Sequence, residues 1–69
     1  MTVQELIKIL ESLNSQTRVV VKGYEGGVND VQSVADILIA LNQNTEWYYG
    51  KHEIANSNEP YDEQAYLIV

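Results

Sequence analysis

The sequence predicts an α+β fold, an N-terminal helix packed on a small, mostly antiparallel three-stranded sheet with a long polar loop. Three observations favour this class: helical spacing of apolar residues near the N-terminus, β-prone runs bounded by turn residues, and an extended polar stretch before the last run. With 69 residues the chain is expected to form one domain, residues 1–69, with a small core. Because the sequence has no cysteine, disulfides cannot reinforce that core, and oligomerisation as a homodimer is expected.

The helix is the clearest element. Thr2 and Glu5 have the spacing of a capping box, and Met1 can contact Leu6 as a hydrophobic staple. One apolar stripe follows at intervals of i, i+3, i+4 and i+7, formed by Leu6, Ile9, Leu10 and Leu13. The turn-forming run at residues 14–16 is expected to end the helix.

Three extended runs are expected to form the sheet. Residues 17–23 alternate in character, residues 34–41 are apolar on both faces as a central strand would be, and residues 65–69 are β-prone. The expected core is drawn from the helix stripe and these strands: Leu6, Ile9, Leu10, Leu13, Val19, Val21, Ile37, Ile39, Leu41 and Leu67.

Two polar segments join these runs. The sequence YEGGVND, residues 24–30, is expected to be a turn because its paired glycines accept positive φ. Residues 42–63 are expected to be a long loop, within which a short hairpin at residues 47–54 is an alternative. A helix beginning at Pro60 is the rival interpretation of the C-terminal part, since proline suits a first helical turn.

The net charge of −6 is unevenly distributed. Residues 1–23 hold two acids and three bases, a balance of +1, whereas residues 24–69 hold eight acids and only Lys51, a balance of −7. Such a field repels nucleic acid and anionic membranes and attracts a basic protein surface. No basic, apolar signal-peptide pattern opens the sequence and no apolar run approaches about 20 residues, so a cytoplasmic location is expected.

Residues with catalytic chemistry are few. His52 is the only histidine, and no serine lies in a G-x-S-x-G turn, so we expect no catalytic site, no metal site and no cofactor. In the turn, Tyr24, Glu25, Asn29 and Asp30 are candidate binding residues. The oxygens of Glu25, Asn29 and Asp30 could serve calcium, but the spacing is not that of an EF-hand, and the acids repel phosphate. A plain turn is favoured.

The segment NTEWYYGKHE is the strongest candidate for a binding surface. Trp47, Tyr48 and Tyr49 are adjacent in a polar stretch and are followed by His52, a composition typical of binding hot spots. The alternative is that these aromatic side chains complete the small core. Stacking on single-stranded nucleic acid is not expected, because only Lys51 supplies a nearby positive charge.

Three stretches, TVQELIKILESL, RVVVKGYEGG and NTEWYYGKHE, resemble a group of short uncharacterised bacterial and phage-type proteins. The resemblance covers roughly residues 1–54. It implies a phage or mobile-element origin and assigns no activity and no functional residue.

Three functions follow as hypotheses. The first is a non-catalytic protein-binding module that uses the aromatic segment and the acidic surface. The second is a phage counter-defence inhibitor that mimics nucleic-acid charge, which requires an ordered acidic face from Glu53, Glu59, Asp62 and Glu63. The third is a small hydrolase or metal-dependent activity centred on His52 with Glu25 or Asp30.

Overall fold

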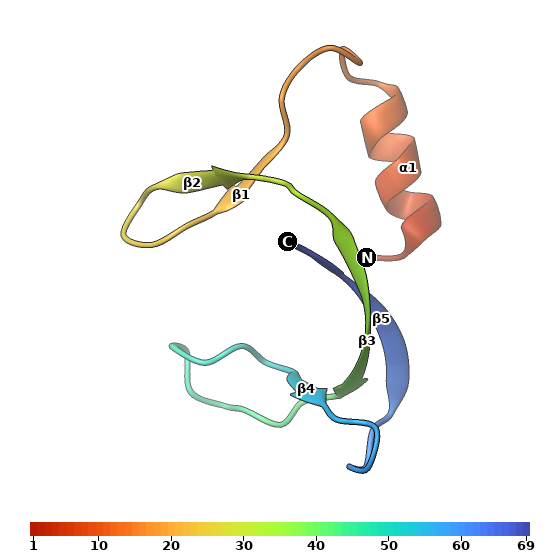
Figure 1. Cartoon of the computed structure of the whole chain (residues 1–69), viewed down its shortest axis with the longest axis vertical. Helices are drawn as coiled ribbons and strands as arrows, with labels where there is room; N and C mark the ends of the chain where they lie inside the picture. Colours follow the sequence, from red (N-terminus) through yellow and green to blue (C-terminus); the bar gives the residue numbers. More distant parts are fainter. The chain divides into compact units, whose positions relative to one another are not determined.

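The computed structural model describes residues 1–69 and contains one helix and two antiparallel sheets (Figure 1). The predicted α+β class is confirmed. The elements, in chain order, are α1 (Val3–Glu11), β1 (Val20–Lys22), β2 (Val28–Asp30), β3 (Val34–Ala40), β4 (Glu53–Ala55) and β5 (Glu63–Ile68). No helix has the length and apolar character needed to cross a bilayer.

The chain divides into two compact units. Met1–Asp30 contains α1, β1 and β2, and Val31–Val69 contains β3, β4 and β5. The helix and the three-stranded sheet therefore belong to different units, and the expected packing of one on the other stays a prediction, as does the single domain.

Helix α1 begins where the capping box predicts. The Thr2 hydroxyl accepts a hydrogen bond from the Glu5 backbone N–H at 3.2 Å and donates to the Glu5 carboxylate at 3.0 Å. This cap satisfies one of the N–H groups that a helix leaves free at its start. The helix ends at Glu11, before the predicted turn, because the backbone N–H and the hydroxyl of Ser12 both donate to the Ile9 carbonyl, at 3.3 and 2.7 Å.

Strands β1 and β2 form a hairpin, in which Val20 lies opposite Asp30 and Lys22 opposite Val28. At the turn, the Gly27 N–H donates to the Tyr24 carbonyl at 3.0 Å. The two residues between them, Glu25 and Gly26, have φ of 47° and 83°. Positive φ at both central positions is what a type I′ hairpin turn requires. Of the two glycines expected to supply it only Gly26 does, and Glu25 occupies the other position.

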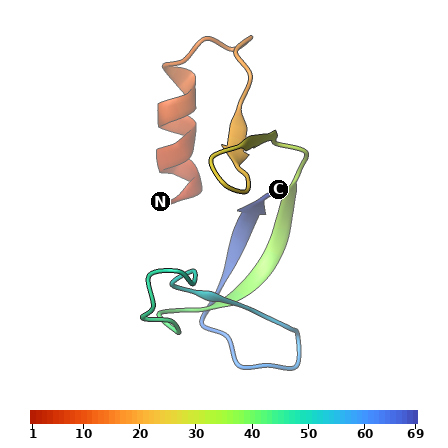
Figure 2. The same ribbon diagram turned by 90° about the vertical axis from the view of Figure 1, so that its left-hand side faces the viewer.

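The second sheet has the strand order β4-β3-β5, so the prediction that residues 34–41 form a central strand is confirmed (Figure 2). Leu38 lies opposite Ala55 of β4, and Val34 lies opposite Ile68 of β5. Residues that lie opposite each other share a face. The more apolar face of this sheet combines Ala35, Ile37, Ile39, Ile54, Ala65 and Leu67, with Glu63, opposite Ile39, as its one charged residue.

The expected strand assignment was wrong in three places. Residues 17–23 shorten to β1, which pairs with β2 in a separate sheet instead of joining β3. Both β2 and β4 lie in segments expected to be turn or loop, because three-residue strands carry too little alternation to be recognised. The strand expected at residues 65–69 is confirmed as β5, and the rival helix beginning at Pro60 does not form.

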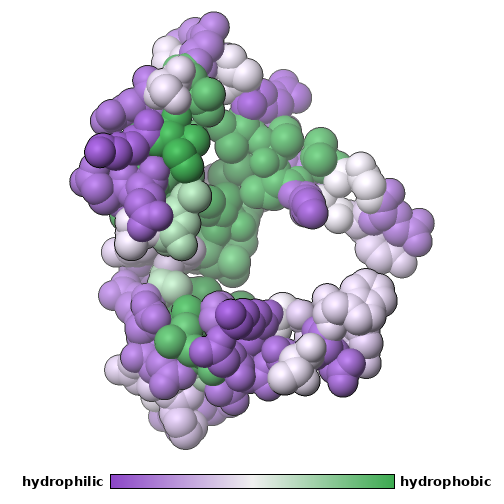
Figure 3. All heavy atoms as spheres, turned by 180° about the vertical axis from the view of Figure 1, so that it is seen from behind, coloured by the Kyte–Doolittle hydropathy of each residue, from purple (hydrophilic) through white to green (hydrophobic).

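No side chain of the chain is buried. Of the ten expected core residues, Leu6, Val21, Ile37, Ile39 and Leu41 are half-buried, and the other five are exposed. Within its own unit each predicted core residue is thus at most half-buried, and burial between the helix and the sheet stays a prediction. In the Val31–Val69 unit burial is limited because strands and loops alone are present, so no helix of that unit covers either face of the sheet. Apolar atoms are accordingly visible at the surface in Figure 3.

Candidate functional site

The aromatic loop, which we define as residues 42–52, joins β3 to β4 (Figure 1), and its aromatic side chains are exposed. Trp47 is 92% exposed, Tyr48 62% and Tyr49 60%. These side chains are therefore not part of a core, which was the alternative interpretation of the segment. Exposed aromatic groups this large are uncommon on a surface that contacts only water.

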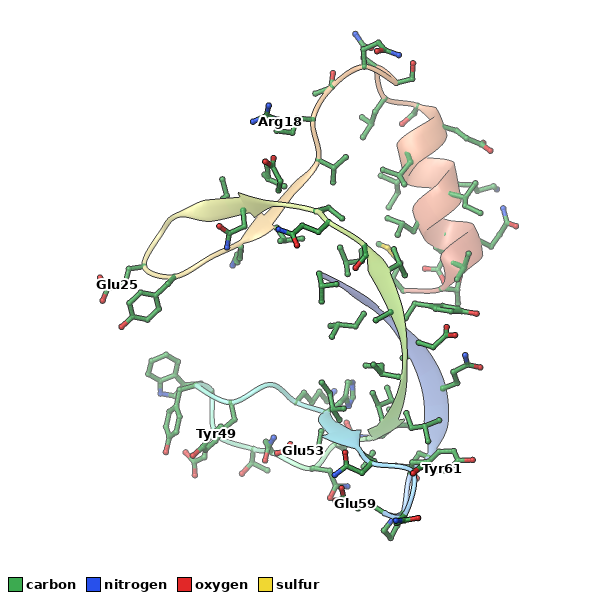
Figure 4. The ribbon with its side chains drawn as sticks, viewed as in Figure 1. Arg18, Glu25, Tyr49, Glu53, Glu59 and Tyr61 are labelled. Carbon is green, nitrogen blue, oxygen red and sulfur yellow. The ribbon has the colours of Figure 1, made fainter.

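The three rings contact one another. The centroids of Trp47 and Tyr48 are 5.6 Å apart with the rings at 88°, and those of Tyr48 and Tyr49 are 4.9 Å apart at 48°. Edge-to-face and tilted contacts at these distances are favourable for aromatic pairs. The loop therefore carries one continuous aromatic cluster, on which Tyr49 is marked in Figure 4.

A side-chain amide holds the base of this loop. The Nδ2 group of Asn44 donates to the Gly50 carbonyl at 2.7 Å and to the Glu53 carboxylate at 2.8 Å. Backbone bonds from Gln43 and Asn44 to the Lys51 carbonyl, at 2.9 and 3.2 Å, add to it. Asn44 is half-buried, so these bonds are partly sheltered from water and fix the two arms of the loop together.

His52 also acts in closing the loop. Its Nδ1 atom accepts a hydrogen bond from the Asn42 backbone N–H at 3.0 Å. Asn42 has a φ of 54°, so it makes the left-handed turn at the end of β3, a conformation that asparagine tolerates better than most residues. The neutral ring therefore carries its proton on Nε2. The geometry gives His52 a structural contact inside the loop.

The predicted residues of the turn lie apart in the chain from the aromatic loop, in the Met1–Asp30 unit. Tyr24 is 88% exposed at the start of the turn, and Glu25 is the first residue of positive φ. Asn29 lies in β2, and Asp30 forms a 3.5 Å ion pair with Arg18 whose two side chains are 64% and 77% exposed. An exposed pair of this kind contributes little stability.

An open groove of about 430 Å³ lies between the β3–β4 end of the sheet and the segment that leads into β5. Its lining comprises apolar residues and three carboxylates: Ala40, Gln43, Glu53, Ile54, Ala55, Glu59, Pro60, Tyr61 and Asp62. Glu53, Glu59 and Tyr61 are marked in Figure 4. We call this feature the acidic groove. Three of the four acids expected to share one face therefore line it, and the fourth, Glu63, lies opposite Ile39 within the sheet.

Each groove carboxylate is held by one donor. Asp62 accepts from the Leu41 N–H at 2.6 Å, Glu59 from the Asn56 N–H at 3.0 Å, and Glu53 from Asn44. The other oxygen of each carboxylate accepts no hydrogen bond from the protein. No group of three or more histidine and acidic residues is positioned to hold a metal ion.

Sequence reasoning missed two parts of this site. Asn44 was one polar residue in a polar run, and nothing in that run distinguishes it from Asn42. Two apolar residues of the groove lining, Ala40 and Ile54, come from β3 and the unrecognised β4. Ile54 is the only β-branched residue near β4, so no run of such residues marks this strand.

The fold and the site thus define a small α+β chain with an exposed, internally hydrogen-bonded aromatic loop and an adjoining acidic groove. Comparison with known proteins finds no protein family, no curated protein and no solved structure that matches the chain.

Proposed function

We propose that the chain is a non-catalytic protein-binding module whose contact surface is the aromatic loop together with the acidic groove. The proposal rests on one observation: the aromatic loop is exposed but held in one conformation. Trp47 is 92% exposed, and the Asn44 amide closes the loop that holds it. A preformed loop loses little conformational entropy when a partner covers it. The proposal takes the chain to act in the cytoplasm, as its sequence predicts.

The aromatic rings supply the energy for such contact. Trp and Tyr side chains each bury on the order of 150–250 Å² when fully covered, and they dominate the affinity of many interfaces. The polar tips of these rings remain able to hydrogen-bond at the rim of an interface. A partner with a complementary apolar depression fits this surface.

The acidic groove determines which partners the surface favours. Glu53 belongs to both features, because its side chain lines the groove and accepts the hydrogen bond from Asn44 at the base of the loop. The carboxylates beside the aromatic cluster favour a partner that carries arginine or lysine next to its apolar contact. Lys51 is the only base in residues 24–69 and leaves this charge largely uncompensated.

The experiment is affinity capture from bacterial lysate with the wild type and with a Trp47→Ala, Tyr49→Ala variant. The matched control is Tyr24→Ala, which removes an aromatic side chain that is 88% exposed in the other unit. We expect the captured protein to be lost with the loop variant and kept with the control. Retention of the same partner by a correctly folded loop variant would refute the proposal.

A second candidate is supported by the groove itself: an inhibitor, of bacterial or phage origin, that presents carboxylates where a nucleic-acid-handling protein expects phosphates. The support is that Glu53, Glu59 and Asp62 line one groove and that hydrogen bonds fix one oxygen of each. Glu63 does not join them. The proposed origin rests on the sequence resemblance.

The salt dependence of binding and competition by nucleic acid distinguish the two candidate functions. A charge mimic loses affinity steeply as salt rises, and duplex DNA or RNA displaces it from its target. Glu59→Gln should then weaken binding severalfold, while Glu11→Gln on α1 should not. Binding that survives high salt and is insensitive to nucleic acid favours the aromatic loop as the main contact.

An enzyme centred on His52 stays a prediction without comparable support. The Nδ1 atom of His52 is engaged with the Asn42 backbone, which leaves Nε2 as the only ring nitrogen free for chemistry.

A further inference from the structure

The two edges of the three-stranded sheet are unequal. One edge is β4, which has three residues, and the other is β5, which has six residues, Glu63–Ile68. A short edge strand offers few backbone groups to another chain, whereas a long one is a template for strand addition.

The pairing of Val69 with Ser33, just before β3, determines which residues of β5 hydrogen-bond to β3 and which point away from it. Ser33 and Val69 exchange both backbone hydrogen bonds, at 2.9 and 3.0 Å. Because bonded and non-bonded pairs alternate in an antiparallel ladder, the pairs Ala35 with Leu67 and Ile37 with Ala65 are bonded as well. The intervening residues of β5, Gln64, Tyr66 and Ile68, therefore direct their N–H and C=O groups away from β3, toward the free edge.

Five of the six residues of this edge lack the features that prevent strand addition; the exception is Glu63, a charge on the more apolar face at the first position of β5. Natural edge strands are interrupted by proline, lysine, bulges or inward-pointing charges. The sequence of β5 is EQAYLI, and its only charged residue is Glu63 at the first position. Tyr66 is 56% exposed and Ile68 42%, so apolar side chains flank the open backbone groups.

We propose that the β5 edge binds the β5 edge of a second copy of this chain, antiparallel, with Tyr66 opposite its own counterpart across a twofold axis. In this register Gln64 lies opposite Ile68 of the second copy, so all three outward-facing residues exchange backbone hydrogen bonds. A register shifted by two residues would pair only two of the three within the strand.

Two further observations favour a second copy as the occupant. The Glu63 carboxylates of the two copies lie at opposite ends of the paired strands, about 20 Å apart, so the only charge on the strand does not oppose the contact. In addition, the strands and loops of the Val31–Val69 unit bury none of its own residues. Strand addition joins two three-stranded sheets into one and extends their more apolar face, and small folds of this kind gain stability through assembly.

The absence of cysteine in the natural sequence allows a direct test by single-cysteine cross-linking. In the proposed register the two copies of residue 66 have Cα atoms about 5.5 Å apart, within the range of a disulfide. The two copies of residue 64 are about 14 Å apart. Tyr66→Cys should therefore form a disulfide-linked dimer under mild oxidation, whereas Gln64→Cys alone should not.

Two mixtures complete the test. Gln64→Cys mixed with Ile68→Cys should form a linked heterodimer, because these positions lie opposite each other. Tyr66→Lys and Tyr66→Glu should each sediment as monomers and, when mixed, recover a dimer through opposite charges at the twofold axis. Tyr61→Lys, the same exchange outside β5, should remain dimeric.

The proposal is wrong if the wild-type chain sediments as a monomer at a concentration of about 100 µM. Cross-linking of Gln64→Cys as efficient as that of Tyr66→Cys would also overturn it. The inference is separable from the proposed function, because the Trp47→Ala, Tyr49→Ala variant should cross-link at position 66 like the wild-type background.

Discussion

At the scale of single residues, Asn44 is the side chain on which the aromatic loop depends most. One amide group spans from the Gly50 carbonyl to the Glu53 carboxylate, and so connects the far arm of the loop with the first residue of β4 and the acidic groove. No other side chain in the chain bridges two acceptors in this way.

Asn44→Ala should loosen the loop and lower the free energy of unfolding by about 1–2 kcal/mol, because two hydrogen bonds are lost from a half-buried position. Trp47 is the only tryptophan, so its fluorescence anisotropy reports on the loop alone. We expect both the Trp47 anisotropy and the urea midpoint of unfolding to fall. Asn58→Ala, an exposed asparagine outside the loop, is the control. Unchanged anisotropy would show that Asn44 does not order the aromatic cluster.

At the scale of elements, the β1–β2 hairpin has one residue in an unfavourable conformation. Glu25 has a φ of 47°, which asparagine and glycine adopt at lower cost than glutamate. Glu25→Asn creates an Asn-Gly pair, the preferred sequence of a type I′ turn, and should stabilise the hairpin by about 0.5 kcal/mol. The Gly27 amide, which donates to Tyr24, should then exchange with solvent about twofold more slowly. Equal or faster exchange would contradict the prediction.

The elements also show what could be predicted from the sequence. Helix α1 was predictable because its apolar residues recur with the helical period, and strand β3 because apolar residues lie on both of its faces, as in a central strand. Strands β2 and β4 were not, because three residues such as VND carry no period and depend on a neighbouring strand for their conformation.

Part of the candidate site could likewise be predicted from the sequence, and part could not. Trp47, Tyr48 and Tyr49 could be singled out from residue type alone, since adjacent aromatics in a polar stretch are unusual. Their exposure and the amide of Asn44 could not, because both depend on a register between β3 and β4 that the sequence pattern does not encode.

At the scale of the whole molecule, each of the two units is held by backbone hydrogen bonds and has no fully buried side chain of its own. No side chain is buried, and the half-buried residues concentrate in β3, the one strand with neighbours on both sides. The marginal stability expected of so small a chain makes association with other chains a natural source of further stability.

The central position of β3 has a kinetic consequence. Pairing β3 with β4 joins residues as close in sequence as Ala40 and Glu53, whereas pairing it with β5 joins residues as distant as Val34 and Ile68. Closing the shorter segment costs less chain entropy, so the β3–β4 hairpin should form first during folding. Quenched-flow hydrogen exchange is expected to protect the amides of Gln43 and Asn44 before that of Val69; the reverse order would exclude this sequence of events. The surface that we propose to bind a partner would then take shape before the sheet that supports it is complete.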